Sequence, residues 1–265
     1  MDLTWLQDQA FVQRAAYILG FFAVGIWEIL APLQEAPVGF SRRWTANGVL
    51  YFATLFTTIF IGRLGLVATA ETAAGRGGGL AGAAWLSPWL ASLVWVLAAD
   101  LLSFFVHRLL HRVPLLWRAH KVHHSDPGFD LTTQLRFHPL EAVVTLGSQA
   151  ALAWVLAPPA TAVFLFEAVR TAGGFFTHAN ASFSPPVERW INRVLITPNL
   201  HRVHHATQTA DHDTNFGVFF SFWDRLSGTF RERSGPISTG LAGISPIEST
   251  RPLHLLLLPF LRIPK

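Results

Sequence analysis

Residues 90–111 read LASLVWVLAADLLSFFVHRLLH, an apolar run that ends in two histidines four positions apart. A helix needs about 20 predominantly apolar residues to cross a hydrocarbon core, and this run is long enough. Residues four apart lie on one helix face, so His107 and His111 would point the same way at the end of the span. The stretch therefore predicts a membrane helix that carries a metal-binding pair.

The composition of the whole chain also indicates a membrane protein. Of 265 residues, 51% are hydrophobic and only 14% are charged, unlike the usual composition of soluble domains. The formal net charge is +4, but no dense lysine or arginine run suggests nucleic-acid binding. The lack of cysteine excludes thiolate haem ligation, iron–sulfur clusters and cysteine nucleophiles. MDLTWLQDQA at the start contains no basic leader, so we expect the first apolar segment to remain as a span.

Five apolar segments approach the length of a membrane span. They lie near residues 10–31, 47–70, 84–106, 140–157 and 159–177. Lysine and arginine favour cytoplasmic loops, and here Arg42 and Arg43 follow the first segment while most others lie between 108 and 136 or after 189. We therefore expect the N-terminus outside and the Arg42 loop, residues 107–139 and the region after 178 on the cytoplasmic side.

These segments predict one all-α integral membrane domain over residues 1–265, a polytopic bundle of four to five spans with a cytoplasmic helical cap. The last apolar run, LHLLLLPFLRIP, is too short to cross a membrane and is broken by Pro259. The expected parts are 1–106 with spans one to three, 107–139 as a cytoplasmic histidine segment, 140–177 with spans four and five, 178–252 as the cap and 253–265 as an interfacial tail.

Histidines recur in two similar five-residue patterns, HKVHH at 120–124 and HRVHH at 201–205. In each pattern the spacings of three and four would put the rings on one helix face. Together with His107 and His111 they make eight histidines, more than the three or four protein ligands of one zinc site. The count favours two metals in one pocket, and imidazole alone leaves zinc, iron, copper and nickel open.

Other uses of these histidines fit the sequence less well. A pH sensor does not require the repeated spacing, and a zincin protease would need HExxH, which the sequence lacks. Haem between spans would need histidines within the apolar segments. A metal transporter or sensor would prefer intramembrane ligands with exit routes. That function stays an alternative, together with a protein that holds structural zinc.

Six elements, in this order, resemble those of the fatty acid hydroxylase superfamily of membrane proteins, which includes sterol desaturases and alkylglycerol monooxygenase. The elements are HRLLH (107–111), HKVHH (120–124), RFHPLE (136–141), THAN (177–180), HRVHH (201–205) and DTNFGVFFSFWDRLSGTF (213–230). The resemblance covers the chain from the third predicted span to residue 231.

This resemblance implies a non-haem di-iron oxygenase that uses O2 to hydroxylate or desaturate a fatty acyl, sterol-like or ether lipid. It implies two iron ions at the cytoplasmic membrane face, although zinc can occupy such ligands in a purified sample. His212 has no counterpart in the family, and we expect it to be a solvated loop residue. The implied metal ligands are His107, His111, His120, His123, His124, His138, His178, His201, His204 and His205.

Some polar residues are candidates for holding these ligands in place. Asp213 and Asn215 of DTNFG could accept a hydrogen bond from a ligand imidazole, or could form a turn that ends the preceding helix. Asp100 lies two turns before His107 on the same helix face, and we expect it to orient a ligand histidine.

Three further acids have structural alternatives. Glu141 could support a ligand or simply start the fourth span. Asp224 is expected to form a structural ion pair with Arg225, and Glu167 could pair with Arg170 one turn later.

Such an oxygenase needs electrons, and the sequence carries no dinucleotide-binding or haem motif. We therefore expect a separate ferredoxin- or cytochrome-type donor to dock on a basic cytoplasmic surface, and the protein to lie in a bacterial inner membrane. The candidate contacts for the acidic face of this donor are Arg189, Arg193, Arg231 and Arg233.

Overall fold

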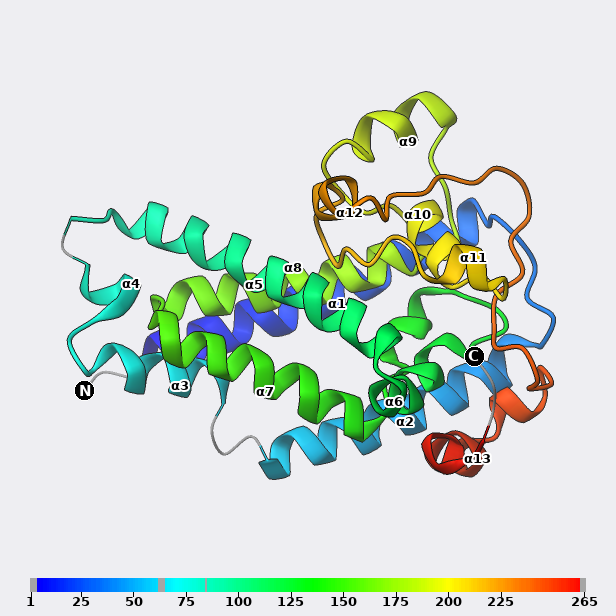
Figure 1. Ribbon diagram of the computed structural model, residues 1–265, viewed down its shortest axis with the longest axis horizontal. Helices are drawn as coiled ribbons and strands as arrows, with labels where there is room; N and C mark the ends of the chain where they lie inside the picture. Colours follow the sequence, from blue (N-terminus) through cyan, green and yellow to red (C-terminus); the bar gives the residue numbers. More distant parts are fainter. Residues whose placement is uncertain (1–3, 62–64, 84, 263–265) are drawn as a thin grey trace.

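The computed structural model describes residues 4–61, 65–83 and 85–262, which form an elongated bundle of helices joined by loops (Figure 1). The longer helices are α1 (Thr4–Leu30), α2 (Phe40–Ile61), α5 (Pro88–Arg112), α7 (Pro139–Leu156) and α8 (Ala160–Thr177). The shorter helices are α3 (Leu66–Ala74), α4 (Gly79–Gly82), α6 (Pro114–His124), α9 (Pro185–Ile191), α10 (Pro198–His204), α11 (Thr209–His212), α12 (Phe222–Ser227) and α13 (Pro252–Leu257), with 3-10 turns η1 (Leu131–Leu135), η2 (Glu248–Thr250) and η3 (Leu258–Phe260).

Three helices in this part of the chain are long and apolar enough to cross a membrane: Phe11–Leu30 within α1, α5 and α7. They correspond to the first, third and fourth predicted spans. α8 occupies the position of the fifth predicted span, but Glu167 and Arg170 make it less apolar. The all-helical membrane bundle is thus confirmed, whereas the number of spans stays a prediction.

The second predicted span, 47–70, does not form one helix. α2 ends at Ile61, residues 62–64 lie outside the described residues, and α3 begins at Leu66. Gly65 has an extended conformation, with φ −51° and ψ 149°, and forms the N-cap of α3. The apolar run is therefore divided into two helices, of which α3 packs against α7 and α8.

The bundle has its core where α5, α7 and α8 meet. Trp95, Ala153 and Phe166 are buried there together, and α3 closes the same cluster. α1 packs along α8, while α7 also contacts α2 and α3. Many large apolar side chains on the outer faces, such as Phe22 and Phe52, stay exposed, as expected for a surface that faces lipid.

Proline residues set two sharp corners of the bundle, one near the histidines and one at the opposite end, beside α4. Val113 ends α5 and Pro114 begins α6, because proline lacks the N–H that would continue the preceding helix. This corner turns HKVHH back toward HRLLH. The α7 helix ends at Ala157, whose φ of 44° is left-handed, and Pro159 then forms the N-cap of α8.

The histidine-bearing elements gather at one end of the bundle. In Figure 1, α6, α10 and α11 lie toward the end opposite α3 and α4. Arg43, near the start of α2, forms ion pairs with Asp126 and Asp130 just after α6, so the Arg42 loop lies at the same end. The sorting of basic residues predicted this proximity, and the cytoplasmic location of this end stays a prediction.

The C-terminal segment forms α13 and η3, which lie against α2 and α6. Leu255 and Leu258 are buried, whereas Leu253, Leu257 and Phe260 are exposed. This division into two faces fits the predicted interfacial tail. Residues 263–265 of that tail lie outside the described residues.

Candidate metal centre

Nine of the predicted ligands come together in two buried groups. Within each group, one possible ligand atom per residue lies within 4.8 Å of the others. His124 and His205, from different groups, stack with ring centroids 4.3 Å apart, so the two groups share one pocket. The first group is His107, His111, His120, His124 and His204, and the second is His123, His178, His201 and His205.

The distances between Nε2 atoms fit metal coordination. The Nε2 of His124 lies 3.1 Å from that of His111 and 3.1 Å from that of His120. In the second group, the Nε2 of His178 lies 3.2 Å from that of His123 and 3.0 Å from that of His201. With metal–nitrogen bonds of about 2.0–2.1 Å, nitrogens around one ion lie about 2.9–3.4 Å apart. Both groups therefore fit a bound metal ion.

Main-chain carbonyls hold two rings of the first group from the other side. Nδ1 of His107 lies 2.8 Å from the Phe216 oxygen, and Nδ1 of His204 lies 2.7 Å from the Thr214 oxygen. A carbonyl oxygen only accepts, so Nδ1 carries the proton and Nε2 keeps its lone pair for a metal. Both Nε2 atoms are buried without a hydrogen-bond partner among the described residues.

Two further rings are held in the same way. Nδ1 of His178 lies 2.8 Å from the Gly174 oxygen, one turn earlier in α8. Nδ1 of His120 lies 2.8 Å from Oε1 of Glu141, and both side chains are buried. Glu141 therefore supports a site histidine in addition to lying in the first turn of α7.

Replacing Glu141 by leucine should weaken metal binding by about 10- to 100-fold, the usual cost of losing an acceptor behind a metal-bound imidazole. Glu141→Gln keeps an oxygen acceptor for His120 and should lose less. Competition with a chelator measures the affinity of both variants. Equal affinities in the wild type and Glu141→Leu would show that Glu141 has no such role.

His212 is buried against the site, contrary to the expectation of a solvated loop residue. It is 5% exposed, and it forms a third possible metal-binding group with His111 and Asp213. The short helix α11 turns it inward, so its ring lies 4.6 Å from that of His124. Asp213 Oδ1 lies 3.4 Å from Nδ1 of His111, so the two side chains are neighbours, and the supporting role of Asp213 stays a prediction.

Asn215 supports the loop rather than an imidazole. Its Nδ2 donates to the carbonyls of Leu200 and Arg231, and its Oδ1 accepts from the Arg231 N–H. Asn215 adopts a left-handed φ of 51°, which asparagine tolerates better than most residues. It thereby ties the loop that carries the Thr214 and Phe216 carbonyls to α10.

Asp224 holds the same loop. Its carboxylate accepts from the N–H groups of Phe216 and Gly217, at 2.8 and 2.7 Å. The expected ion pair with Arg225 is not formed, because Arg225 turns away to stack on Phe230. Asp224 therefore fixes the peptide whose oxygen orients His107.

Asp100 also contacts this segment. Its Oδ2 accepts from the indole N–H of Trp223 at 2.8 Å and from the Phe220 N–H at 3.3 Å. The expected hydrogen bond to an imidazole is not among those of the described residues. Within α5 the carboxylate instead finds donors on the segment around α12, which satisfies part of its hydrogen-bonding need.

His138 lies outside both groups, so the structure does not bring it together with the nine other predicted ligands, and its role as a ligand stays a prediction. Pro139 begins α7, which makes His138 the N-cap of that helix. Its Nδ1 accepts from the Leu140 N–H, and its Nε2 lies 3.1 Å from the Leu256 oxygen. Both ring nitrogens are therefore used by the main chain.

Burial keeps the site imidazoles neutral. It lowers the pKa of His178 to about 4, and burial together with neighbouring rings lowers the pKa of other site histidines well below its usual value. A neutral imidazole is the form that binds metal. The histidines of this second set are His123, His124, His201, His204 and His205.

A buried polar network, which the sequence reasoning missed, anchors the end of α6. Asp126 pairs with Arg43, and Arg136 donates to the Val122 carbonyl and to Asn47. Burial alone would raise the pKa of Asp126, but the two guanidiniums lower it below its usual range. Arg136 in RFHPLE could have indicated this network in the sequence. A guanidinium stays charged at all ordinary pH values, so an arginine close to two predicted spans needs a polar or acidic partner when it is buried.

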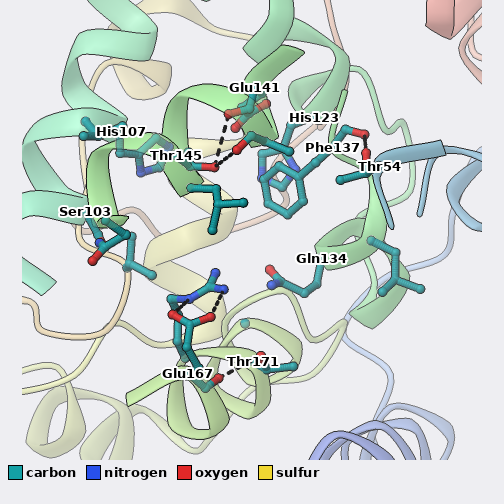
Figure 2. Close-up of a pocket in the computed structure, with 18 of the residues that line it drawn as sticks. Thr54, Ser103, His107, His123, Gln134, Phe137, Glu141, Thr145, Glu167 and Thr171 are labelled. Atoms are coloured by element: carbon teal, nitrogen blue, oxygen red, sulfur yellow. Dashed lines mark hydrogen bonds and ion pairs between the residues drawn. The ribbon is translucent and has the colours of Figure 1, made fainter. Parts of the chain in front are cut away.

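A cavity of about 350 Å³ adjoins both groups. Figure 2 shows His107, His123 and Glu141 on one side, and Glu167 and Thr171 on the other. Much of the wall is apolar and comes from α3, α5, α7 and α8, including Leu66, Val106, Leu110, Leu146 and Phe175. Such a cavity suits an alkyl chain placed beside the histidines.

The sequence model of the fatty acid hydroxylase family matches residues 92–229, a range that includes every histidine of both groups. The chain belongs to the fatty acid hydroxylase family. The resemblance inferred from the motifs is thus confirmed. All nine histidines of the two groups of this family member lie within the matched residues.

Curated relatives of this fatty acid hydroxylase family member are named as lipid-modifying enzymes. The chain is 28% identical to the alkylglycerol monooxygenase of Homo sapiens over 64% of this chain and 37% of that protein. It is 30% identical to the ornithine lipid hydroxylase OlsE of Rhizobium tropici, over 59% of this chain and 47% of that protein. It is 29% identical to the cholesterol 25-hydroxylase of Mus musculus, over 59% of this chain and 52% of that protein. The matched part thus spans little more than half of these relatives at most. No solved structure matches the chain significantly.

Proposed function

We propose that this protein is a membrane oxidoreductase that uses O2 at a di-iron centre to hydroxylate or desaturate a lipid. The observation that carries the proposal is that both histidine groups adjoin one largely apolar cavity among membrane helices. The relatives named as hydroxylases and monooxygenases of lipids support the reaction class.

In this proposal, bound iron supplies the oxidising power for an unactivated C–H bond, which side chains alone lack. The protein chain itself binds the lipid and orients the imidazoles. The Thr214 and Phe216 carbonyls and the Glu141 carboxylate fix the imidazoles, and the apolar wall holds the alkyl chain. Burial of both groups keeps bulk water from the reacting carbon.

The test combines metal analysis with lipid chemistry. Protein purified without air and loaded with iron should retain iron, and cells with the gene should contain a lipid that has gained one oxygen or lost two hydrogens. Cells without the gene are the control. Tightly held zinc without O2 consumption would favour a structural metal, and metal efflux without O2 consumption would favour a transporter. Either result contradicts the proposal.

We further propose that the histidine end faces the cytoplasm of a bacterial cell, where a ferredoxin- or cytochrome-type donor docks. Arg189 and Arg193, in α9 and just after it, are exposed. Arg231 and Arg233 both pair with Asp211, which compensates part of their charge. Arg189 and Arg193 are therefore the better candidates to meet the acidic face of a donor.

The double change Arg189→Glu/Arg193→Glu should raise the KM for the donor by about tenfold at low salt, since each reversed surface charge costs about 0.7 kcal/mol. The increase should shrink at high ionic strength, because salt screens exposed charges. Turnover at saturating donor should not change. Arg76→Glu, at the opposite end of the bundle, is the control, and an equal rise in that variant would contradict the docking site.

A further inference from the structure

Glu167 and Arg170 of α8 form an ion pair on the wall of the cavity. Arg170 donates from Nε to Oε1 at 3.1 Å and from Nη2 to Oε2 at 2.7 Å. The Arg170 side chain is 38% exposed, and both residues line the same cavity as His107 and His123. Figure 2 shows Glu167 across the cavity from these histidines. An ion pair among apolar helices is costly, which points to a function.

Polar atoms around the cavity are left with hydrogen-bonding capacity. The pair with Glu167 uses Nε and Nη2 of Arg170, and Nη1 has no hydrogen bond among the described residues. Gln149, on α7, is 8% exposed and lines the same cavity. Its Nε2 donates to Ala99 and Ser103, but its buried Oε1 has no partner in the described part of the chain. A buried amide oxygen of this kind requires a donor.

We propose that Arg170, Glu167 and Gln149 bind an uncharged hydroxyl- or amide-bearing group of the lipid, and so determine which lipids enter the cavity. This inference rests on the proposed function, because it names the substrate class of that same site. A hydroxyl can donate to the Gln149 oxygen or the Glu167 carboxylate while it accepts from Arg170. Neither of these hydrogen bonds requires the ion pair between Glu167 and Arg170 to break.

The charge balance favours an uncharged group over a phosphate or carboxylate. Glu167 already neutralises Arg170, and no other lysine or arginine is among the described residues that line the cavity. An anionic group would therefore bring a second negative charge beside Glu167 in a poorly hydrated space. A hydroxyl or amide group brings no charge into the cavity.

The position of the pair also limits where the lipid reacts. His178 follows Arg170 by eight residues in and just after α8, which corresponds to about 12 Å along a helix. The reacting carbon would therefore lie several bonds from the bound polar group. Val106 and Leu110, which line the same cavity, offer an apolar wall for the alkyl chain.

The test is equilibrium binding to the full-length protein in nanodiscs, without O2 or reductant. Three tritiated probes of equal chain length are compared: hexadecane-1,2-diol, hexadecane and hexadecyl phosphate, each corrected for uptake by empty nanodiscs. The wild type should bind the diol about tenfold more tightly than either other probe, the gain expected from a hydrogen bond to a charged group. Glu167→Leu/Arg170→Leu should abolish this preference and leave hexadecane binding unchanged.

The double variant removes both charges together, so it leaves no unpaired ion that would unfold the protein. Gln149→Leu is the second variant and should lower diol affinity alone, and Arg76→Met, outside the cavity, should preserve the preference. Equal binding of diol and hexadecane by the wild type, tighter binding of the phosphate, or a preference that survives in both cavity variants would overturn the inference. Selective diol binding without any product from the iron-loaded enzyme and a donor would instead contradict the proposed function.

Discussion

Replacing His123 or His204 by alanine should abolish lipid turnover and lower the iron content of the purified protein. The two residues belong to different groups, so each change would remove one imidazole from a different proposed metal site. Turnover should fall by more than about 100-fold, beyond the loss caused by a residue that only supports a ligand. Iron analysis and product formation measure both effects.

The two variants should also differ from each other. The second group has four histidines and keeps three without His123, whereas the first has five and keeps four without His204. His123→Ala should therefore lose more iron than His204→Ala. Iron and activity retained in both variants would contradict the dimetal site.

His138→Asn is the matched control. Asparagine preserves the helix cap that His138 provides to α7, while the imidazole is lost. Iron content should therefore stay near that of the wild type. A loss of iron comparable to that of His123→Ala would show that His138 binds metal after all.

Replacing Gly217 by alanine should disrupt the site without touching a histidine. A Cβ at this position would lie 2.6 Å from the Phe220 oxygen and 2.9 Å from Oδ2 of Asp224. The loop would have to move, and the Phe216 oxygen that holds His107 would move with it. We expect a loss of stability of about 1–3 kcal/mol from this overpacking and a large loss of iron, measured by thermal unfolding and metal analysis.

Gly147→Ala, in the interior of α7, is the control for this change. Nothing lies within 4 Å of a Cβ at Gly147, and alanine favours a helix over glycine by about 1 kcal/mol. This variant should be as stable as the wild type or slightly more stable. Equal behaviour of the two variants would show that the close packing at Gly217 is not required.

The spacing of the histidines predicted most of the site, because i,i+3 and i,i+4 positions share a helix face wherever the helix lies. HKVHH on α6 and HRVHH on α10 and its C-cap do turn their rings to one pocket, but each pattern gives two histidines to one group and one to the other. Helix spacing does not determine how the chain enters a helix, however. His138 precedes a proline and becomes a helix cap apart from the two groups. His212 was expected in a solvated loop, but the short helix α11 turns it inward.

The fold was predictable where apolar length alone decides the structure, as for α5 and α7. It was not predictable in the 47–70 segment, where the extended Gly65 separates α2 from α3. The supporting contacts of the site were harder still. Two of them come from the carbonyls of Thr214 and Phe216, which every residue type carries, so no side chain in the sequence marks them.

The division of the histidines between the two groups has a consequence for biosynthesis. The first group combines four histidines of α5 and α6 with His204, and the second combines His123 with His178, His201 and His205. A ribosome-bound chain that ends before His204 can complete neither group. If the two groups bind metal as proposed, full coordination has to follow synthesis of α7 and α8, which separate the early histidines from His204 and His205.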